Sequence, residues 1–540
     1  MRIKHLLAIA SVFAGALAAH GVPARPGYHT LTGPDGNPVT VEMRGDENFH
    51  YFVDLEGRTL VRSASGQLQY MSPAEFTTRM TEVAATSVTR RKPGEIKRTF
   101  PTTGTVRGLV ILCEFPETKF QEKSTREYFD AKINQLNYEG PETFGSVADF
   151  FAEQSCGVFT PVFDVVGPVT MPHAASYYSA NGLNLTDFFR DMCIAADEEC
   201  DVDFTRYDVD NDGFVDFVFG IFAGYSQAQS LNASDIWPAM MHLDNYVYDM
   251  FDGMYLNIAA CASELKGAEG TEHDGVGTIC HEFSHILGLP DIYDATYGGG
   301  NGMNHWDIMD VGTYNGDGKI PCGYTAMDRY TLGWLDPIEL TGAGTDYELP
   351  NLVDSNKAVF IVNPENENEY FTLENRQLTG FDSGLPGHGL IISQVNYDKN
   401  VWNKNTVNSP GLSGFEHVAL MAADNSHLAA TESGDPFPGV KGITEFTAAT
   451  RPAAHWISTD KDCEMPITNI RETEDGRILF DYGTTSGLTD IEAPAMTIDE
   501  LIAAGAQVFN IAGQRVNPAA LTPGIYIVSY QGEARKFTVR

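Results

Sequence analysis

Hydrophobic and polar residues follow different periodicities in successive parts of the chain. Residues 25–71 alternate short apolar runs with turn sequences such as GPDGN and DLEGR, which predicts β-hairpins. Residues 106–115 form a continuous apolar run, typical of a strand buried on both faces. Residues 146–157 place apolar side chains at helical spacing behind a serine that can cap a helix. A strand-like segment at 161–169 and a helical one at 185–199 follow, so a mixed α/β domain is expected.

The second half of the chain has a strand pattern. Helical signals fade after about residue 336, and strand-like segments separated by turns continue to about residue 482. A linker is expected at 484–495. The last segment contains QVFNIAGQRV, LTPGIYIVSY and EARKFTV, which predicts three strands of a small β-sandwich module.

Composition narrows the classes of partner. The 540 residues carry 35 Lys and Arg against 73 Asp and Glu, a net charge of −38. Nucleic acid and anionic membrane surfaces are therefore unsuitable partners. Such an acidic balance is typical of exported proteins, and some of the carboxylates are expected to be calcium ligands.

The first residues predict export. Arg2 and Lys4 precede a short apolar run at 6–18, and residues 16–18 read Ala-Leu-Ala, a small-residue cleavage site. We expect a signal peptide over 1–19 and a secreted protein, extracellular or on the cell surface. The apolar run is too short to span a bilayer, and no later stretch is long and apolar enough.

Cysteine and basic residues add two expectations. Export permits disulfides, but spacing does not reveal their pairing, and no CxxC occurs. The eight cysteines are at positions 113, 156, 193, 200, 261, 280, 322 and 463.

Residues 89–98, TRRKPGEIKR, form a basic run in an acidic chain. We interpret this run either as a protease-sensitive linker behind a removable pro-segment or as a solvated loop. The pro-segment contains no cysteine, so a thiolate cannot silence a metal there.

The strongest chemical signal is CHEFSHILGLPD at 280–291. His281 and His285 are four residues apart and lie on one face of a helix, where they can bind one metal ion. Glu282 stands where a carboxylate reaches a metal-bound water, and Gly288 permits the turn that ends the helix. Zinc is the expected metal, because it accepts mixed nitrogen and oxygen ligands and leaves one position for water. This pattern predicts hydrolysis of a peptide bond, with Glu282 as general base and acid.

Three further residues belong to this prediction. Asp291 is the favoured third zinc ligand, because the turn at Gly288 brings it back toward the histidines; Glu264 is the alternative. Met309 in WDIMD is expected in a turn beneath the metal, where it packs rather than binds. Tyr314 is a weak candidate for stabilising an oxyanion, and a core or rim tyrosine is the favoured interpretation.

A second ligand pattern is DVDNDGFVD at 208–216. Asp208, Asp210 and Asp212 occupy positions 1, 3 and 5 of a calcium loop, the Phe214 carbonyl position 7 and Asp216 position 9. Position 12 is Phe219, so the bidentate Glu of an EF-hand is missing. We therefore expect a structural Ca²⁺ site on another scaffold; a plain acidic turn is the alternative. The GDPFPG segment at 434–439 is a weaker calcium candidate.

These segments resemble the immune inhibitor A family of secreted bacterial zinc metallopeptidases. The resemblance rests on HEFSHILGLPDIYD, WDIMDVGTYNG, DRYTLGWLDP, SVADFFAEQSCGVFTPVFDVVGPV and EYFTLENRQLTGFDSGLPGHGLI, within 107–456. It implies a metzincin-like fold, a pro-segment, calcium-stabilised loops and endopeptidase activity. It assigns the zinc histidines to His281 and His285 and the catalytic residue to Glu282. Ser284 stands where the family often has Gly, a small-for-small change that leaves the ligands intact.

The tail at 507–540 resembles the C-terminal sorting domains of type IX secretion in Bacteroidota, which implies the type IX machinery as a partner. Together these features predict an α+β multidomain zymogen of a zinc endopeptidase acting on proteins or peptides. A surface adhesin on an idle peptidase scaffold is the competing function. The expected parts are a signal peptide (1–19), a β-rich pro-segment with its basic linker (20–100), a metallopeptidase domain (101–340), a β-rich domain with sandwich character (341–482), a linker (483–505) and a sorting-type β module (506–540).

Overall fold

The computed structural model describes residues 19–483 except 64, 90–99, 180–181, 245, 297–298 and 341, and most of 502–539. Within 502–539 the gaps are 503–504, 511–513, 519–520, 523 and 531–532. The predicted signal peptide up to residue 18, residues 90–98 of the basic run and the predicted linker at 484–495 therefore lie outside the described residues. No helix among the described residues is long and apolar enough to cross a membrane.

A six-stranded sheet organises the first half of the molecule, in the order β1-β10-β11-β9-β7-β8. Its central strands run parallel, and the short β10 pairs antiparallel with β11. The strands are β1 (Ala19–His20), β7 (Arg107–Glu114), β8 (Val162–Thr170), β9 (Phe214–Tyr225), β10 (Met240–His242) and β11 (Tyr255–Leu265). The predicted buried strand at 106–115 is confirmed as β7.

Helices cover both faces of this sheet, as their apolar periodicity requires. α3 and α7 pack in the core on one face, and α5 packs in the core on the other. Ser146 caps α3 in a capping box with Asp149, which confirms the helix predicted there. The helices of this half are α2 (Arg126–Asn134), α3 (Val147–Gln154), α4 (Ala175–Ser179), α5 (Gly182–Cys200), η1 (Phe204–Tyr207), α6 (Gln227–Ser230), α7 (Gly277–Ile286), η2 (Asn304–Trp306), η3 (Val311–Gly318) and α8 (Ala326–Thr331).

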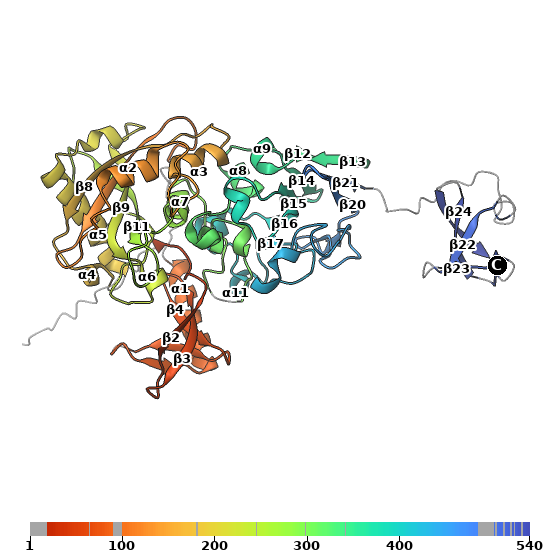
Figure 1. The fold of residues 1–540 in the computed structure, drawn as a ribbon, viewed down its shortest axis with the longest axis horizontal. Helices are drawn as coiled ribbons and strands as arrows, with labels where there is room; N and C mark the ends of the chain where they lie inside the picture. The colour runs from red at the N-terminus through yellow and green to blue at the C-terminus, as the bar shows by residue number, and fades with distance from the viewer. Residues whose placement is uncertain are drawn as a thin grey trace, which may run out of the picture.

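The N-terminal region forms a separate five-stranded antiparallel sheet, β2-β3-β4-β5-β6, followed by a helix that the sequence patterns did not indicate. The predicted hairpins are thus confirmed. Figure 1 shows this sheet projecting from the main body, with α1 beside it. The elements are β2 (Tyr28–Thr32), β3 (Pro38–Gly45), β4 (His50–Asp54), β5 (Thr59–Arg62), β6 (Leu68–Tyr70) and α1 (Pro73–Thr89).

The region after residue 337 is β-rich, as predicted. A five-stranded sheet, β12-β14-β15-β16-β17, and a three-stranded sheet, β13-β21-β20, contribute side chains to one shared core, which gives a sandwich. Its elements are β12 (Ile338–Glu339), β13 (Gly344–Leu349), α9 (Leu352–Ser355), β14 (Val359–Asn363), β15 (Asn366–Arg376), η4 (Gly380–Gly384), β16 (Gly389–Asn396), α10 (Lys399–Asn403), α11 (Pro410–Ser413), β17 (Val418–Leu420), η5 (Ala429–Gly434), β18 (His455–Trp456), β19 (Lys461–Asp462), β20 (Ile467–Glu472) and β21 (Ile478–Tyr482).

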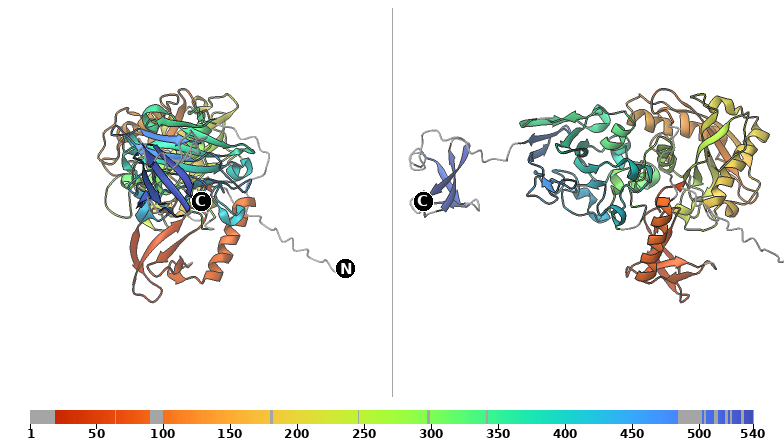
Figure 2. Two further views of the ribbon diagram at one scale, coloured as in Figure 1. Left: turned by 90° about the vertical axis from the view of Figure 1, so that its right-hand side faces the viewer. Right: turned by 180° about the vertical axis from the view of Figure 1, so that it is seen from behind.

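The C-terminal module corrects one prediction. Its described residues form a single four-stranded antiparallel sheet, β23-β22-β24-β25, rather than a three-stranded part of a sandwich. QVFNIAGQRV does not run as one strand, because the chain reverses and its two ends pair as a hairpin. The right-hand view of Figure 2 shows this sheet apart from the main body. The strands are β22 (Gln507–Asn510), β23 (Arg515–Val516), β24 (Gly524–Tyr530) and β25 (Glu533–Val539).

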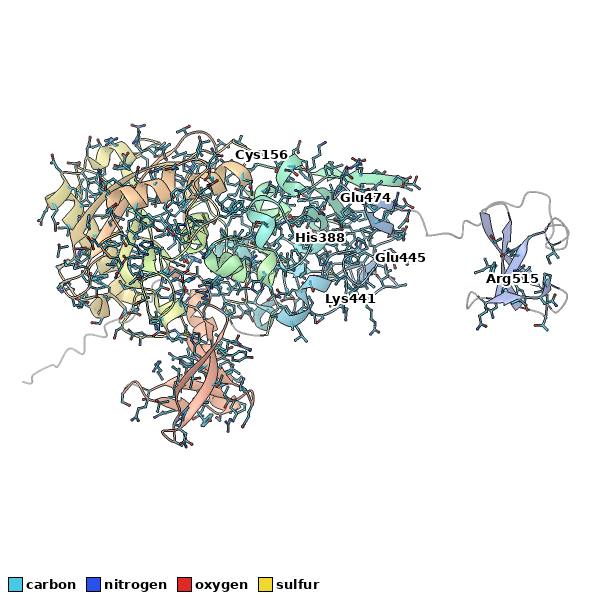
Figure 3. All side chains as sticks on the ribbon, in the orientation of Figure 1. Cys156, His388, Lys441, Glu445, Glu474 and Arg515 are labelled. Atoms are coloured by element: carbon cyan, nitrogen blue, oxygen red, sulfur yellow. The ribbon has the colours of Figure 1, made fainter. Side chains whose placement is uncertain are left out.

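All eight cysteines lie among the described residues, and none is paired in a disulfide. Cys280 is buried in α7, as predicted. Cys156 is exposed and is labelled in Figure 3.

Candidate active site

The helix α7 carries the two predicted histidines and is itself completely buried. Gly277 allows its first turn to approach η3, because a Cβ at this position would lie 2.0 Å from the Thr313 carbonyl oxygen. Gly288 ends it with a φ of +103°, a conformation that favours glycine. The rings of His281 and His285 lie on one face, with centroids 4.8 Å apart.

The outer ring nitrogens are fixed by backbone carbonyls. Nδ1 of His281 lies 2.7 Å from the Ile308 carbonyl oxygen, and Nδ1 of His285 lies 2.9 Å from that of Leu289. A carbonyl only accepts, so each Nδ1 carries the hydrogen and each Nε2 presents a lone pair. This arrangement is typical of metal-binding histidines.

Asp291 completes the constellation. Its Oδ1 lies 3.3 Å from Nε2 of His281 and 3.2 Å from Nε2 of His285. None of these three buried atoms has a hydrogen-bond partner. With the hydrogen of each ring on Nδ1, two Nε2 lone pairs and a carboxylate oxygen face one another.

Two of the three separations within this donor set are those expected around a tetrahedral zinc ion. Bonds of about 2.0–2.1 Å place neighbouring ligand atoms about 3.3–3.4 Å apart. The two observed separations, 3.2 and 3.3 Å, match this value. Buried lone pairs without donors are costly unless a cation balances them. His281, His285 and Asp291 are thus the residues that would hold the metal.

Glu264, the alternative third ligand, lies elsewhere. Its Oε1 accepts hydrogen bonds from the Gln121 amide, at 2.8 Å, and from the Ser124 hydroxyl. Its Oε2 accepts from the Gly224 amide at 3.1 Å. Through these hydrogen bonds, Glu264 links a loop to the sheet. The structure therefore brings Asp291, and not Glu264, to the two histidines.

Asn405 holds Asp291 from the β-rich region. Its Nδ2 donates to Oδ2 of Asp291, and its Oδ1 accepts from the Asp291 amide at 2.7 Å. The residue lies 114 positions further along the chain, just after α10. The sequence analysis did not identify it, because no local spacing links an asparagine this distant to a histidine helix.

Replacing Asn405 by Ala is expected to weaken zinc binding by roughly 10–100-fold, as loss of an outer-shell partner typically does. The physical reason is that Asp291 would lose the group that fixes its orientation. Competition with a zinc chelator measures the affinity. The exposed Asn400 offers a matched control, and equal affinities of Asn405→Ala, Asn400→Ala and the unmodified chain would contradict this role.

Glu282 lies next to the histidines, and its side chain contacts the N-terminal segment of the chain. Its Oε1 accepts a hydrogen bond from the Val22 amide at 2.9 Å, and its Oε2 is buried without a partner. Burial raises the pKa of Glu282 well above its usual value, although the Val22 amide lowers it somewhat. Such a carboxylate takes up a proton more readily than an exposed one.

Residues 19–25, here called the strap, cross the site. β1 extends the sheet edge, with Ala19 opposite Met241 and His20 opposite Met240. Three side chains of the half built on the six-stranded sheet donate hydrogen bonds to the following carbonyl oxygens. Tyr293 donates to Gly21 at 2.7 Å, Trp237 to Val22 at 2.9 Å and Tyr314 to Pro23 at 2.8 Å. Tyr314, the weak oxyanion candidate, thus contacts the strap, and the strap itself was not anticipated.

Met309 lies in the core beneath the histidine helix. Its side chain is fully buried, and its carbonyl oxygen accepts from the Ile292 amide at 2.9 Å. The preceding carbonyl, of Ile308, is the one that fixes His281. The segment therefore supports the site by packing and by one backbone contact.

The structure also brings together the first three residues of the predicted calcium loop. Carboxylate oxygens of Asp208, Asp210 and Asp212 lie within 4.8 Å of one another. Asp208 is held by the amides of Asp212 and Gly213, at 3.0 Å each. Asp216 is outside this group: its Oδ2 accepts from the Val209 amide at 2.8 Å. Burial and then the neighbouring aspartates raise the pKa of Asp216 to about 6, which shows the local excess of negative charge.

Residues 109–334 match the family model described as the catalytic domain of immune inhibitor A peptidase M6. The matched residues include most of the six-stranded sheet from β7 onward, α7 and Asp291, so this part of the chain is similar to peptidase M6 catalytic domains.

Two relatives agree with this match. The chain is 26% identical over 293 residues, 45% of its length, to "Immune inhibitor A" of Bacillus thuringiensis subsp. alesti. It is 22% identical over 274 residues, 42% of its length, to "Pre-pro-metalloprotease PrtV" of Vibrio cholerae serotype O1. The matched parts cover 42% and 29% of these relatives, less than half of each. Together they support a metallopeptidase.

Proposed function

We propose that the chain is the latent precursor of a secreted zinc endopeptidase that cleaves protein substrates. One observation carries this proposal: the Asp291 Oδ1 lies 3.3 Å from Nε2 of His281 and 3.2 Å from Nε2 of His285, and Glu282 lies beside them. A bound zinc ion would polarise a peptide carbonyl and lower the pKa of water. Residues 109–334, which contain this donor set, match the peptidase M6 family model, and this match supports the proposal.

The protein's own residues account for the proton movements. Once the strap has left, the Oε1 atom of Glu282 is free of the Val22 amide. In the proposed mechanism this carboxylate takes the proton of the attacking water and passes it to the leaving amine nitrogen. In the precursor, burial raises the pKa of Glu282 above its usual value, and a carboxyl group with a raised pKa accepts and returns a proton more readily than an exposed one. Tyr314 and Tyr293 then become available to a substrate's backbone.

The strap supports latency. Its backbone occupies contacts on Tyr293, Trp237 and Tyr314 and covers Glu282. The N-terminal sheet is anchored on the same side, where its apolar residues pack against Ala228, Leu231, Trp237 and Tyr314. Arg25 also donates to Gln229 at 2.8 Å. One matched relative is named as a pre-pro-metalloprotease. Cleavage within 89–98 would separate this N-terminal unit from the peptidase.

We assign a role in export to each of the two ends of the chain. The proposed route begins with the signal peptide at 1–19 and uses the β module at 506–540 as a sorting signal of the type IX kind. The compact four-stranded sheet, joined to the sandwich by residues 483–505, suits a removable address module.

The loop at 208–216 is proposed as a structural calcium site, in which Asp208, Asp210, Asp212 and the Phe214 carbonyl bind the ion and Asp216 orders the loop. A cation would offset the negative charge of the three carboxylates whose oxygens lie within 4.8 Å of one another.

Calcium removal is expected to lower the melting temperature while zinc is retained. At a free Ca²⁺ concentration about 100-fold above Kd, binding stabilises the fold by about 2.7 kcal/mol. This corresponds to roughly 5–10 °C for a domain of this size. Calorimetry with and without a calcium-selective chelator measures the shift. Asp210→Asn combined with Asp212→Asn should abolish the shift, and the exposed Asp197→Asn should not. The same shift in all three proteins would contradict the site.

Cleavage of casein or gelatin by the linker-cut protein, with and without a chelator, tests the proposed function. We expect chelator-sensitive cleavage. An adhesin on an idle scaffold would bind without cleaving, and a zinc amidase or esterase would turn over small substrates only. Either outcome would overturn the endopeptidase proposal.

A further inference from the structure

We propose that Tyr293 is a catalytic residue whose hydroxyl donates a hydrogen bond to the carbonyl oxygen of the scissile peptide bond and stabilises the negative charge that develops there. This inference rests on the proposed function, because it requires a peptide bond to be attacked beside Glu282. It gives Tyr293 the oxyanion role for which Tyr314 was the weak candidate from the sequence.

One peptide bond of the strap shows where a substrate's peptide bond would lie. The Gly21–Val22 bond is trans, so its C=O and N–H point to opposite sides. On one side the Val22 amide donates to Oε1 of Glu282 at 2.9 Å. On the other side the Gly21 carbonyl accepts from the Tyr293 hydroxyl at 2.7 Å. The carboxylate that would protonate a leaving amine thus contacts the nitrogen of this bond, and Tyr293 contacts its oxygen.

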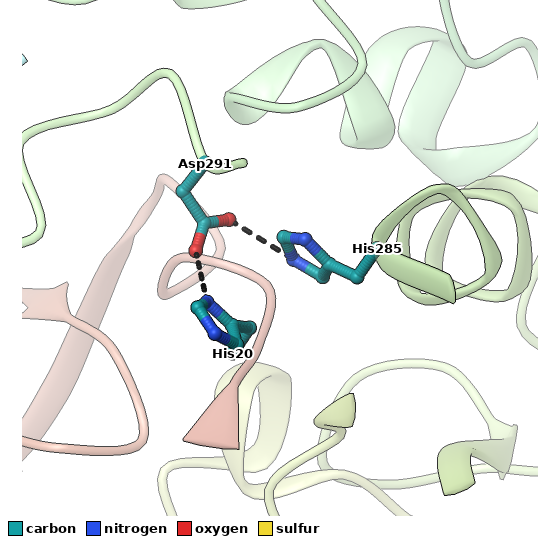
Figure 4. A group of neighbouring side chains, drawn as sticks. All are labelled: His20, His285 and Asp291. Atoms are coloured by element: carbon teal, nitrogen blue, oxygen red, sulfur yellow. Dashed lines mark ion pairs between the residues drawn. The ribbon is translucent and has the colours of Figure 1, made fainter. Parts of the chain in front are cut away.

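The same bond lies next to the metal-binding side chains. Figure 4 shows the residue before it, His20, with its ring directed at the carboxylate of Asp291, as is the ring of His285. Nδ1 of His20 lies 3.9 Å from Oδ2 of Asp291, and the ring centroids of His20 and His285 are 5.3 Å apart. The Gly21–Val22 bond, one residue further along, therefore adjoins both the donor set and Glu282.

The strap runs as an extended substrate is expected to run. β1 pairs antiparallel with β10, which would otherwise be the edge strand of the six-stranded sheet. Extended peptides add to sheet edges in this way, because the free N–H and C=O groups of the edge strand pair with those of the peptide. A substrate paired with β10 in the same register would place its own peptide bond between Glu282 and Tyr293.

The other two side-chain donors bind carbonyl groups further along the strap. Trp237 donates to the next carbonyl after that of Gly21, and Tyr314 donates to the one after that. Both would hold a substrate's backbone in the ground state and in the transition state alike. The hydroxyl of Tyr293 differs because it contacts the carbonyl of the bond whose nitrogen is at Glu282.

The backbone next to Tyr293 is fixed. The preceding residue, Ile292, donates its amide to the Met309 carbonyl at 2.9 Å and accepts at its own carbonyl from Nδ2 of Asn408 at 2.8 Å. Tyr293 is 9% exposed and follows Asp291 by two residues. A donor fixed in a buried site before the reaction stabilises a developing charge more strongly than a mobile, solvated one.

Tyr293→Phe in the linker-cut protein tests the assignment, because it removes the hydroxyl and keeps the ring. We expect kcat for a peptide substrate to fall by about 10²–10³-fold, the usual effect of losing one oxyanion donor, with KM nearly unchanged. Tyr314→Phe should instead raise KM with little change in kcat. Tyr330→Phe is the matched control, since Tyr330 is exposed, and should change neither. Zinc content is measured in parallel, and rates are expressed per bound zinc.

A phosphinic peptide gives a readout that does not depend on turnover, because its tetrahedral, negatively charged group resembles the transition state. Calorimetry should show that Tyr293→Phe binds it about 10²–10³-fold more weakly than Tyr330→Phe does. The uncleaved substrate, measured in the Glu282→Gln background, should bind equally to both. Equal affinities of Tyr293→Phe and Tyr330→Phe for the phosphinic peptide, whatever their cleavage rates, would overturn the role of Tyr293 and leave the proposed function intact. Absence of chelator-sensitive cleavage by the unmodified linker-cut protein would instead overturn the proposed function.

Discussion

Replacing Glu282 by Gln is expected to lower kcat/KM for casein cleavage by about 10²–10⁴-fold, the usual contribution of a general acid and base. Gln fills the same space and can accept from an amide, but it cannot take a proton from water. Glu282 is buried in α7, and its Oε2 has no hydrogen-bond partner. Among the described residues, no other carboxylate is hydrogen-bonded to Glu282 and able to replace it as the base. Initial rates of the linker-cut protein measure the effect.

Glu272→Gln is the matched control, since it makes the same change on an exposed carboxylate of the region that matches peptidase M6. Zinc content is measured in parallel and should stay near one ion per chain in all proteins, because Glu282 is not one of the three donors. Cleavage by Glu282→Gln at the rate of Glu272→Gln, with equal zinc content, would exclude Glu282 as the base.

Asp291→Asn is expected to cost more zinc affinity than the roughly 10–100-fold typical of an outer-shell partner. The Asn side chain keeps the shape of Asp291 but removes the negative charge that faces both Nε2 atoms at 3.2 and 3.3 Å. The affinity is measured by chelator competition, and zinc content after dialysis by elemental analysis.

Asp294→Asn provides the comparison, because Asp294 is three residues away and only orders a turn through Thr296 and Gly300. Its zinc content should be unchanged. Near-normal zinc binding by Asp291→Asn would contradict its assignment as the third ligand and leave the two histidines with a ligand from elsewhere.

The sequence predicted most of what is local. The spacing of His281, Glu282, His285 and Gly288 was sufficient for a helix that ends in a sharp turn, and α7 has that form. The apolar run at 106–115 and the capping serine of α3 were equally informative, because burial and capping depend on neighbours in sequence. The preference for Asp291 over Glu264 followed from the short turn at Gly288 together with the WDIMD segment.

The contributions from distant parts of the chain could not be predicted. Asn405 lies 114 residues from Asp291, and His20 belongs to a two-residue strand beside a predicted signal peptide. Neither has a periodicity or a motif, and each acquires its place through pairing with another part of the fold. The prediction of three strands in the last segment was wrong for a related reason. The pairing of β22 with β23 as a hairpin depends on backbone conformation, which a pattern of apolar residues does not indicate.

A zinc titration of the linker-cut protein tests the central claim most directly. Zinc is first removed with a chelator, and the casein cleavage rate is then measured as Zn²⁺ is added back. We expect no cleavage without zinc and a rise that reaches its plateau at one equivalent per chain, with Glu282→Gln binding the same equivalent but remaining inactive. Cleavage that persists without zinc, or a protein that binds one zinc through these ligands and cleaves nothing, would contradict the account.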